Sequence, residues 1–414
     1  MLAPTPASPE SAGMSKAGLD RTEAHLKSRY IDAGRFPGTQ LLVYRRGKVV
    51  HSAVQGFADV ERKVPVKDDT IFRIYSMTKP LTTVAFMMLV EEGKVALDEP
   101  VVKYIPEWKN LGVFVAGTAP NFMTRPLSRP MLIVDLLRHT AGLTYGFQQR
   151  SNVDAAYREA RIGEVEKAGT LDSMIEALAK IPLEFSPGEA WNYSVATDVI
   201  GYLVGKISGM PFEQFLKARI LEPLGMSDTD FHVPAGKAHR FAACYNADVK
   251  TNSFTLQDDP KTSSFLTPPS LISGGGGLCS TAADYLTFCR ALINGGEVGG
   301  IRLIGPKTLQ LMTSNHLPGG VDLPALSRSL FSEAAYHGIG FGLGFSVTMD
   351  PAKTLIPGSR GEYAWGGAAT TSFWIDPAEE LIAIFMTQVL PSSAYPLRRE
   401  LRTLVYSAIT ESNL

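Results

Sequence analysis

The pattern of hydrophobic and polar positions predicts strands near both ends of the chain. Residues 38–46 and 49–57 are two short apolar runs separated by the turn Arg46-Gly47-Lys48, and a helix is expected before them over about 16–32. Strand patterns return late in the chain, over 340–348, 362–365, 370–375 and 381–387. These segments are expected to form one sheet to which both chain ends contribute.

Helical periodicity dominates between about residues 100 and 270, where strand signals fade. The helices expected here cover 133–139, 154–160, 171–181, 197–208 and 211–219. Further helices are expected over 282–294, 306–313 and 396–412, with a short hairpin at 296–303. We therefore expect an α/β domain made of 1–105 and 275–414 and a mainly helical inserted domain over 106–274. The active site is expected in the cleft between them, a common place for small-molecule sites.

A long apolar helix over 76–93 carries the first candidate chemistry. Pro80 is compatible with a helix only in the first turn, where a missing N–H costs little, and Gly93 is a plausible stop. Ser76 is therefore predicted to lie at the N-terminus of this helix, directly after the strand-like residues 70–74.

Ser76 and Lys79 form the only S-x-x-K sequence among the 18 lysines of the chain. Side chains three residues apart on a helix face the same way, so the Lys79 amine can reach the Ser76 hydroxyl. The positive helix N-terminus favours an oxyanion and disfavours a charged lysine, which suits Lys79 to act as a base. The simpler alternative is a helix-capping serine beside an unrelated lysine.

Two later segments offer the remaining groups of a nucleophilic site. Tyr193 follows the turn Ser186-Pro187-Gly188 and could shuttle protons, although a half-buried structural tyrosine is the alternative. Trp365-Gly366-Gly367 ends a late strand. Adjacent glycines allow backbone to approach a ligand closely, and backbone N–H groups there and at Ser76 would form an oxyanion hole. A β-bulge or tight turn is the alternative interpretation.

Taken together, Ser76-Met-Thr-Lys79, Tyr193-Ser-Val and Trp365-Gly-Gly resemble the signature of the serine β-lactamase and penicillin-binding superfamily. Residues 136–143, 185–188 and 273–284 also match that superfamily's supporting segments. The resemblance implies an α/β (α+β) fold of the β-lactamase/transpeptidase type, with an antiparallel sheet flanked by helices. It also assigns the second oxyanion-hole N–H to Ala368.

Two departures from the superfamily pattern narrow the expected activity. Val195 stands where many members have the asparagine of Tyr-Ala-Asn, and Trp365 stands where many have lysine or histidine. Both departures resemble the family VIII carboxylesterases. An apolar wall at Trp365 suits an uncharged acyl or alkoxy group better than a carboxylate. The resemblance implies short-chain acyl esters, from C2 to about C6, as substrates of a small pocket.

The predicted reaction is ester hydrolysis through an acyl-enzyme on Ser76, with Lys79 as base and Tyr193 as proton relay. An acyltransferase, a weak β-lactamase and a D-aminopeptidase stay open, because each would share the same acyl-enzyme. A non-catalytic binding protein of this fold is a further alternative, although Ser76, Lys79 and Tyr193 are all present. No G-x-S-x-G sequence supports an α/β-hydrolase.

Composition excludes several other classes. The net charge is -1 and no basic cluster appears, which argues against nucleic acid and anionic membranes as partners. Three scattered cysteines without C-x-x-C spacing argue against disulfides and zinc, and no metal or cofactor is expected. The N-terminus lacks a signal-peptide pattern, so a cytoplasmic location is expected, with a periplasmic or secreted one still open. The oligomeric state is not determined by the sequence.

Overall fold

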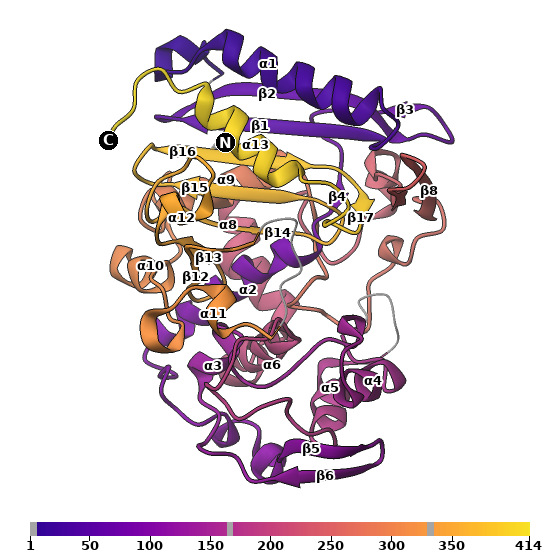
Figure 1. Ribbon diagram of the computed structural model, residues 1–414, viewed down its shortest axis with the longest axis vertical. Helices are drawn as coiled ribbons and strands as arrows, with labels where there is room; N and C mark the ends of the chain where they lie inside the picture. Colours follow the sequence, from indigo (N-terminus) through magenta and orange to yellow (C-terminus); the bar gives the residue numbers. More distant parts are fainter. Residues whose placement is uncertain (1–5, 164–168, 329–334) are drawn as a thin grey trace.

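The computed structural model describes residues 6–163, 169–328 and 335–414. An eight-stranded sheet forms its centre (Figure 1). The strands are β1 (Gly38–Arg45), β2 (Lys48–Asp59), β3 (Val64–Pro65), β12 (Ile339–Phe341), β13 (Ser346–Thr348), β14 (Tyr363–Gly366), β15 (Ser372–Asp376) and β16 (Leu381–Met386). Their order is β12-β13-β14-β15-β16-β1-β2-β3, and neighbouring strands pair antiparallel. β1 pairs directly with β16, so both ends of the chain build the sheet, as predicted.

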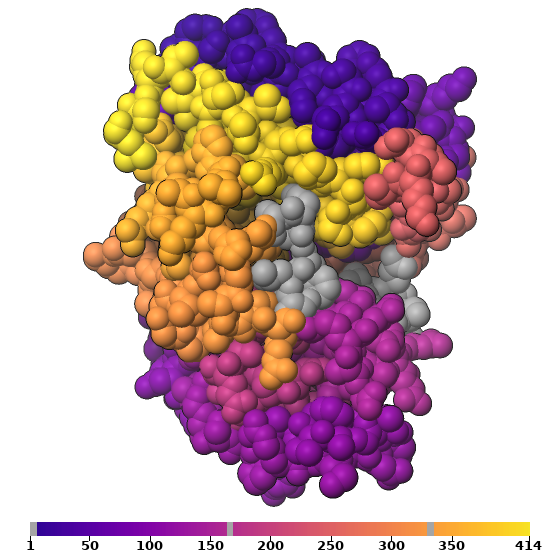
Figure 2. All heavy atoms as spheres, viewed as in Figure 1, coloured from indigo at the N-terminus to yellow at the C-terminus, as the bar shows by residue number. Residues whose placement is uncertain are grey.

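Both faces of this sheet are covered, which explains the continuous apolar runs of its central strands. In β1, Leu41 and Val43 face one hydrophobic cluster, whereas Leu42 and Tyr44 face another. Because side chains alternate along a strand, burying both faces requires apolar residues at every position. Helices α1 (Lys16–Leu26) and α13 (Leu397–Ser407) pack on one face, and α9 (Ala282–Ile293) packs on the other (Figure 1). Figure 2 shows the two chain ends lying against each other.

The middle of the chain is mainly helical, but it also contains two hairpins that the sequence pattern did not predict. Its helices are α3 (Ile133–Leu137), α4 (Asn152–Glu159), α5 (Leu171–Leu178), α6 (Ala196–Ser208), α7 (Phe212–Leu216) and α8 (Glu222–Leu224). The hairpins are β5 (Val113–Thr118) with β6 (Asn121–Arg125), and β7 (Cys244–Asp248) with β8 (Ser253–Asp258). Most residues of β5, β6 and β8 are exposed or half-buried, so no apolar alternation marks them as strands.

The long helix α2, three shorter helices and five short strands complete the list of described α-helices and strands. The remaining helices are α2 (Thr78–Glu91), α10 (Pro306–Met312), α11 (Leu323–Leu326) and α12 (Pro351–Thr354). The remaining strands are β4 (Phe72–Arg73), β9 (Cys279–Ser280), β10 (Glu297–Val298), β11 (Ile301–Arg302) and β17 (Val389–Leu390). The three cysteines are buried free thiols, as expected from their spacing. Within the described ranges, no helix is both long and apolar enough to cross a bilayer.

A predicted strand and the predicted last helix differ in extent from the observed elements. The single strand expected over 340–348 is a hairpin of β12 and β13 that turns at Gly344, where φ is 86°. A Cβ on Gly344 would lie 2.5 Å from Thr83 Oγ1, so α2 packs against this turn and only glycine fits. The last helix stops at Ser407 and not at 412. The first helix keeps its predicted extent, because α1 ends at Leu26 and the chain continues as a π-helical turn over Lys27–Ile31.

One hydrophobic cluster is continuous across the sheet and the helical part, from Tyr44 in β1 to Leu203 in α6. Helix α2 lies in the middle of this cluster and packs against α6. The division into a sheet domain of 1–105 with 275–414 and an inserted domain of 106–274 therefore stays our proposal. In this division α2 and the end of β14 belong to the sheet domain, and both contact the helical part.

Candidate active site

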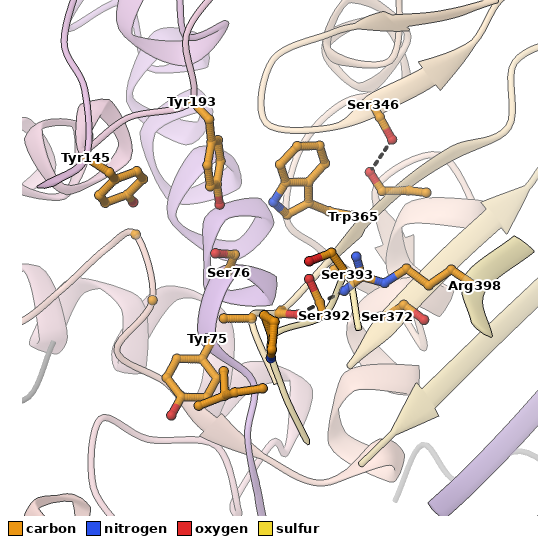
Figure 3. A pocket seen from close by; sticks show the side chains of 18 of the residues that line it. Tyr75, Ser76, Tyr145, Tyr193, Ser346, Trp365, Ser372, Ser392, Ser393 and Arg398 are labelled. Carbon is orange, nitrogen blue, oxygen red and sulfur yellow. Dashed lines mark hydrogen bonds between the residues drawn. The ribbon is translucent and has the colours of Figure 1, made fainter. Parts of the chain in front are cut away.

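A cavity of about 570 Å³ opens where the end of β14 meets the helical part of the molecule. Ser76, Tyr145, Tyr193, Trp365 and Ala368 line it, and Figure 3 shows the labelled side chains around it. These residues come from four separate stretches of the chain. The predicted site residues Ser76, Tyr193 and Trp365 thus share one cavity, whose size is typical of small-molecule sites.

The backbone before Ser76 is held in an unusual conformation. Strand β4 pairs with β9, and the chain then turns sharply at Tyr75, whose φ of 42° is rare for a residue with a side chain. A 3-10 turn over Tyr75–Met77 leads into α2, which places Ser76 at the helix N-terminus, as predicted. Such strain costs on the order of 1–3 kcal/mol and concentrates at functional sites.

Lys79 is buried in the first turn of α2, with 1% of its surface exposed. Its Nζ lies 3.3 Å from Ser76 Oγ, 3.1 Å from Tyr145 Oη and 2.6 Å from the carbonyl oxygen of Gly275. These three acceptors match the three N–H bonds of an ammonium. A neutral amine can donate to Gly275 and Tyr145 while its lone pair accepts the Ser76 proton. The contacts therefore suit both protonation states that a lysine base requires.

Two tyrosines flank Lys79 in different ways. The Tyr145 hydroxyl bonds to Lys79, and burial together with the Asp198 charge holds the Tyr145 pKa well above its usual value. The Tyr193 ring lies 4.5 Å from Lys79 Nζ, and its hydroxyl has no hydrogen-bond partner among the described residues although it is buried. In Figure 3 the Tyr193 ring points toward Ser76. An unpartnered buried hydroxyl is costly, which suits a group that bonds to substrate.

Sequence reasoning identified Tyr193 but missed Tyr145. Tyr145 lies two residues after Leu143, the last residue of the segment 136–143, so its place after that segment was the available signal. The loop that carries it is held by buried contacts of the same segment. His139 Nδ1 lies 3.2 Å from Ser194 Oγ, and burial lowers the His139 pKa well below its usual value. A neutral His139 therefore ties this loop to the Tyr193 segment.

The segment Trp365-Gly366-Gly367-Ala368, at the end of β14, lines another part of the cavity wall. The Trp365 ring centroid lies 5.5 Å from that of Tyr193 and 5.3 Å from that of Phe341. A Cβ on Gly367 would lie 2.5 Å from the carbonyl oxygen of Ile74, the residue before Tyr75. Glycine is needed here because the end of β14 packs directly against the backbone that leads to Ser76.

The backbone of Ala368 also faces the cavity. Its N–H donates to no carbonyl oxygen within the part of the chain that the structure describes. A second oxyanion donor is required near the Ser76 N–H, and Ala368 is available for that bond. Its role stays a prediction. Across the described ranges, no cluster of three or more His, Cys, Asp or Glu side chains could hold a metal ion.

Removing each tyrosine hydroxyl should separate the roles of the two residues. We expect Tyr193→Phe to lower kcat by about 10²-fold or more, since proton transfer to the leaving group is lost. Tyr145→Phe removes one of three contacts of Lys79 and should lower kcat by about tenfold, the worth of one hydrogen bond. Steady-state kinetics with p-nitrophenyl butyrate, alongside thermal unfolding, measures both. The reverse order of effects would assign the relay to Tyr145.

The sequence matches one protein family over most of its length and is similar to several known proteins. The profile of the family described as Beta-lactamase matches residues 19–407. The chain belongs to this family. An uncharacterized protein of Mycobacterium tuberculosis is 38% identical over 376 residues, covering 90% of each chain. Esterase EstB of Burkholderia gladioli is 30% identical over 392 residues, covering 90% of this chain and 91% of EstB.

A solved structure agrees with this assignment. The chain superposes on EstCE1, described as a hydrolase with promiscuous acyltransferase activity, with a TM-score of 0.77 and 26% identity. The match covers 94% of this chain and 99% of EstCE1. The predicted β-lactamase/transpeptidase-like fold and the resemblance to family VIII esterases are confirmed.

Proposed function

We propose that this protein is a serine carboxylesterase that hydrolyses short-chain acyl esters through an acyl-enzyme on Ser76. The observation that carries the proposal is the buried Lys79 amine, which lies 3.3 Å from the Oγ of Ser76, a residue that lines the cavity together with Tyr193 and Trp365. A nucleophile within reach of its base, itself held by further partners, is the arrangement that activates a serine. The esterase name of the Burkholderia relative supports the same reaction class.

The first half-reaction forms the acyl-enzyme. Ser76 Oγ attacks the ester carbonyl carbon while its proton passes to the Lys79 amine. Backbone N–H groups of Ser76 and Ala368 bind the oxyanion of the tetrahedral intermediate. The bond to the alkoxy oxygen then breaks, and that oxygen takes a proton from Lys79 through Tyr193. The alcohol leaves, and the acyl group remains on Ser76.

The second half-reaction repeats these steps with water. Water attacks the acyl carbon, gives its proton to the Tyr193–Lys79 pair, and the carboxylic acid leaves as Ser76 regains its proton. Trp365 with Gly366 and Gly367 forms the wall against which the substrate lies. Arg398 and Arg402 also line the cavity, and Arg398 donates to the Gly367 carbonyl oxygen at 2.8 Å. The Trp365 ring and the two glycines carry no charge themselves, and this apolar ring suits an uncharged acyl or alkoxy group. A small-molecule ester is therefore the proposed partner.

A panel of p-nitrophenyl esters with acyl chains from C2 to C12 tests the substrate class. We expect kcat/KM to be highest for the shortest chains. It should fall beyond about C6, because longer acyl chains no longer fit the part of the cavity that holds the acyl group. Nitrocefin, a cephalosporin, should be turned over at least about 10²-fold more slowly, because the amide-binding asparagine is replaced by Val195. Faster turnover of nitrocefin than of any ester would contradict the proposal.

Acyl transfer is a second candidate function, favoured by the size of the cavity. About 570 Å³ exceeds the space of a butyryl group, so an alcohol can lie beside the acyl-enzyme. The description of EstCE1 as a hydrolase with acyltransferase activity supports this possibility. Adding an acceptor alcohol such as 1-butanol to the ester assay separates the two outcomes. A transferase converts most of the acyl group to butyl ester, whereas a hydrolase releases mainly acid.

A further inference from the structure

A buried carboxylate, that of Asp198, is linked to Lys79 through the backbone of one residue. Asp198 is the third residue of α6, and 2% of its surface is exposed. Its Oδ1 accepts hydrogen bonds from Ser273 Oγ at 2.5 Å and from the Gly275 N–H at 3.0 Å. The carbonyl of the same Gly275 accepts the bond from Lys79 Nζ at 2.6 Å. Asp198 and Lys79 are thus joined through one glycine residue.

Glycine at this position lets the carboxylate approach. A Cβ on Gly275 would lie 2.4 Å from Asp198 Oδ2 and 3.0 Å from Tyr145 Oη. Both oxygen atoms therefore crowd the same small space beside the Lys79 amine. Any other residue at 275 would push Asp198 and Tyr145 apart.

We propose that Asp198 is the third member of a Ser76–Lys79–Asp198 relay, which positions the Lys79 amine through Gly275 and stabilises the ammonium that forms as Ser76 is deprotonated. This inference rests on the proposed esterase function. The logic is that of a buried aspartate behind a base in hydrolytic triads, where the carboxylate stays ionised and supports the cation that appears in the transition state. Here the base is a lysine, and the backbone of Gly275 links it to the carboxylate, since its N–H donates to Asp198 and its carbonyl oxygen accepts from Lys79.

The charges around Lys79 support this role. Burial raises the pKa of Asp198 above its ordinary value, and the Lys79 charge and the bonds from Ser273 and Gly275 offset part of this rise. The other titratable groups that face Lys79 are Tyr145, Tyr193 and His139. Burial raises the Tyr145 pKa and lowers the His139 pKa, so both stay neutral near pH 7. Among the described groups facing Lys79, Asp198 is the one carboxylate.

The sign of the pH effect follows from this arrangement. An ionised carboxylate favours the ammonium form of Lys79 over the neutral amine, so it stabilises the cation that forms in the transition state. Removing the charge should therefore do two things together. The maximal rate falls, and the acidic limb of the pH–rate profile moves to lower pH, because Lys79 loses its proton more easily.

Asp198→Asn is the direct test, because an asparagine oxygen can still accept from Ser273 and Gly275 but carries no charge. We expect kcat/KM for p-nitrophenyl butyrate to fall at least about tenfold at its maximum. The acidic limb should shift down by on the order of one pH unit. Ser273→Ala is the matched control, since it removes a bond to Asp198 and leaves the charge. Its acidic limb should move less than that of Asp198→Asn, because the carboxyl group remains in place.

Two further variants and a second readout complete the test. Asp198→Glu should return the acidic limb toward the wild-type position, and Asp198→Ala provides a second uncharged variant if the asparagine variant does not fold. Labelling of Ser76 by a fluorophosphonate measures the same limb without ester hydrolysis. A rate loss with an unmoved limb in Asp198→Asn or Asp198→Ala would overturn the relay and leave Asp198 as a structural anchor. An inactive wild type that still labels at Ser76 would instead overturn the proposed esterase function alone.

Discussion

Ser76→Ala should abolish ester turnover, lowering kcat for p-nitrophenyl butyrate by at least about 10³-fold. The reason is that Ser76 belongs to the cavity lining and its Oγ lies 3.3 Å from the Lys79 amine. Without it no covalent intermediate forms, and only binding and backbone N–H groups remain to assist attack by water. Intact-protein mass spectrometry after brief exposure to the ester measures this directly. Wild type should carry a transient butyryl adduct, and the alanine variant should carry none.

The control for Ser76→Ala is a serine outside the cavity chemistry. Ser173, in the first turn of α5 on the surface, is suitable because its hydroxyl accepts from the Thr170 N–H and donates to the Thr170 carbonyl oxygen, outside the cavity lining. Ser173→Ala should retain wild-type turnover and the adduct. Turnover by Ser76→Ala equal to that of wild type would show that the motif assignment is wrong, although the fold would stand.

Lys79→Met should lower kcat/KM by about 10²–10⁴-fold, the worth of a positioned general base. Methionine has a similar shape to the buried lysine and leaves no unpaired charge inside the protein. It does leave the Gly275 carbonyl without its donor, which costs about 1–3 kcal/mol of folding stability. Kinetics and thermal unfolding measured on the same preparation therefore distinguish a lost base from a lost fold.

Lys79→Arg separates the charge of Lys79 from its basicity. A guanidinium stays protonated in proteins, so it can donate to Gly275 but cannot accept the proton of Ser76. We expect this variant to be as inactive as Lys79→Met, provided that circular dichroism shows it to be folded. Substantial activity in a folded arginine variant would mean that Lys79 acts through its charge.

The same two residues show why part of the site could be predicted without a structure. Ser76 and Lys79 are three residues apart at the start of one helix, so local geometry alone brings their side chains together. The Trp365-Gly366-Gly367 segment was recognisable because two adjacent glycines in a strand pattern indicate a close approach of another backbone or a ligand. The structure shows that approach in the contact between Gly367 and the backbone of Ile74.

The contacts that hold Lys79 from its other sides could not be predicted in this way. Tyr145 is 66 residues away in sequence from Lys79, and Gly275 is 196 residues away. Neither lies in a pattern with a period that a single sequence reveals. Asp198 is an acidic residue in a mainly apolar helical segment, and that pattern alone does not reveal its contact with Gly275.

The strands likewise include some that the sequence pattern predicted and some that it did not. The runs of β1 and β16 were predicted because both faces of these strands are buried, which makes every position apolar. The hairpin of β5 and β6 was missed because most of its side chains are exposed, and its strands are held by pairing with each other. The turn at Gly344 was missed because its cause, Thr83 in α2, is distant in sequence.

The sequence by itself thus determined the family, the order of strands and helices, and the serine–lysine pair, because these depend on local spacing and on which faces are apolar. Only the tertiary structure decided which groups surround the Lys79 amine, namely Tyr145, the Gly275 carbonyl and, behind it, Asp198. The physical reason is that the proton affinity of a buried amine is set by charges and dipoles within a few ångströms in space. Such neighbours come together only when both chain ends and the helical middle pack around α2.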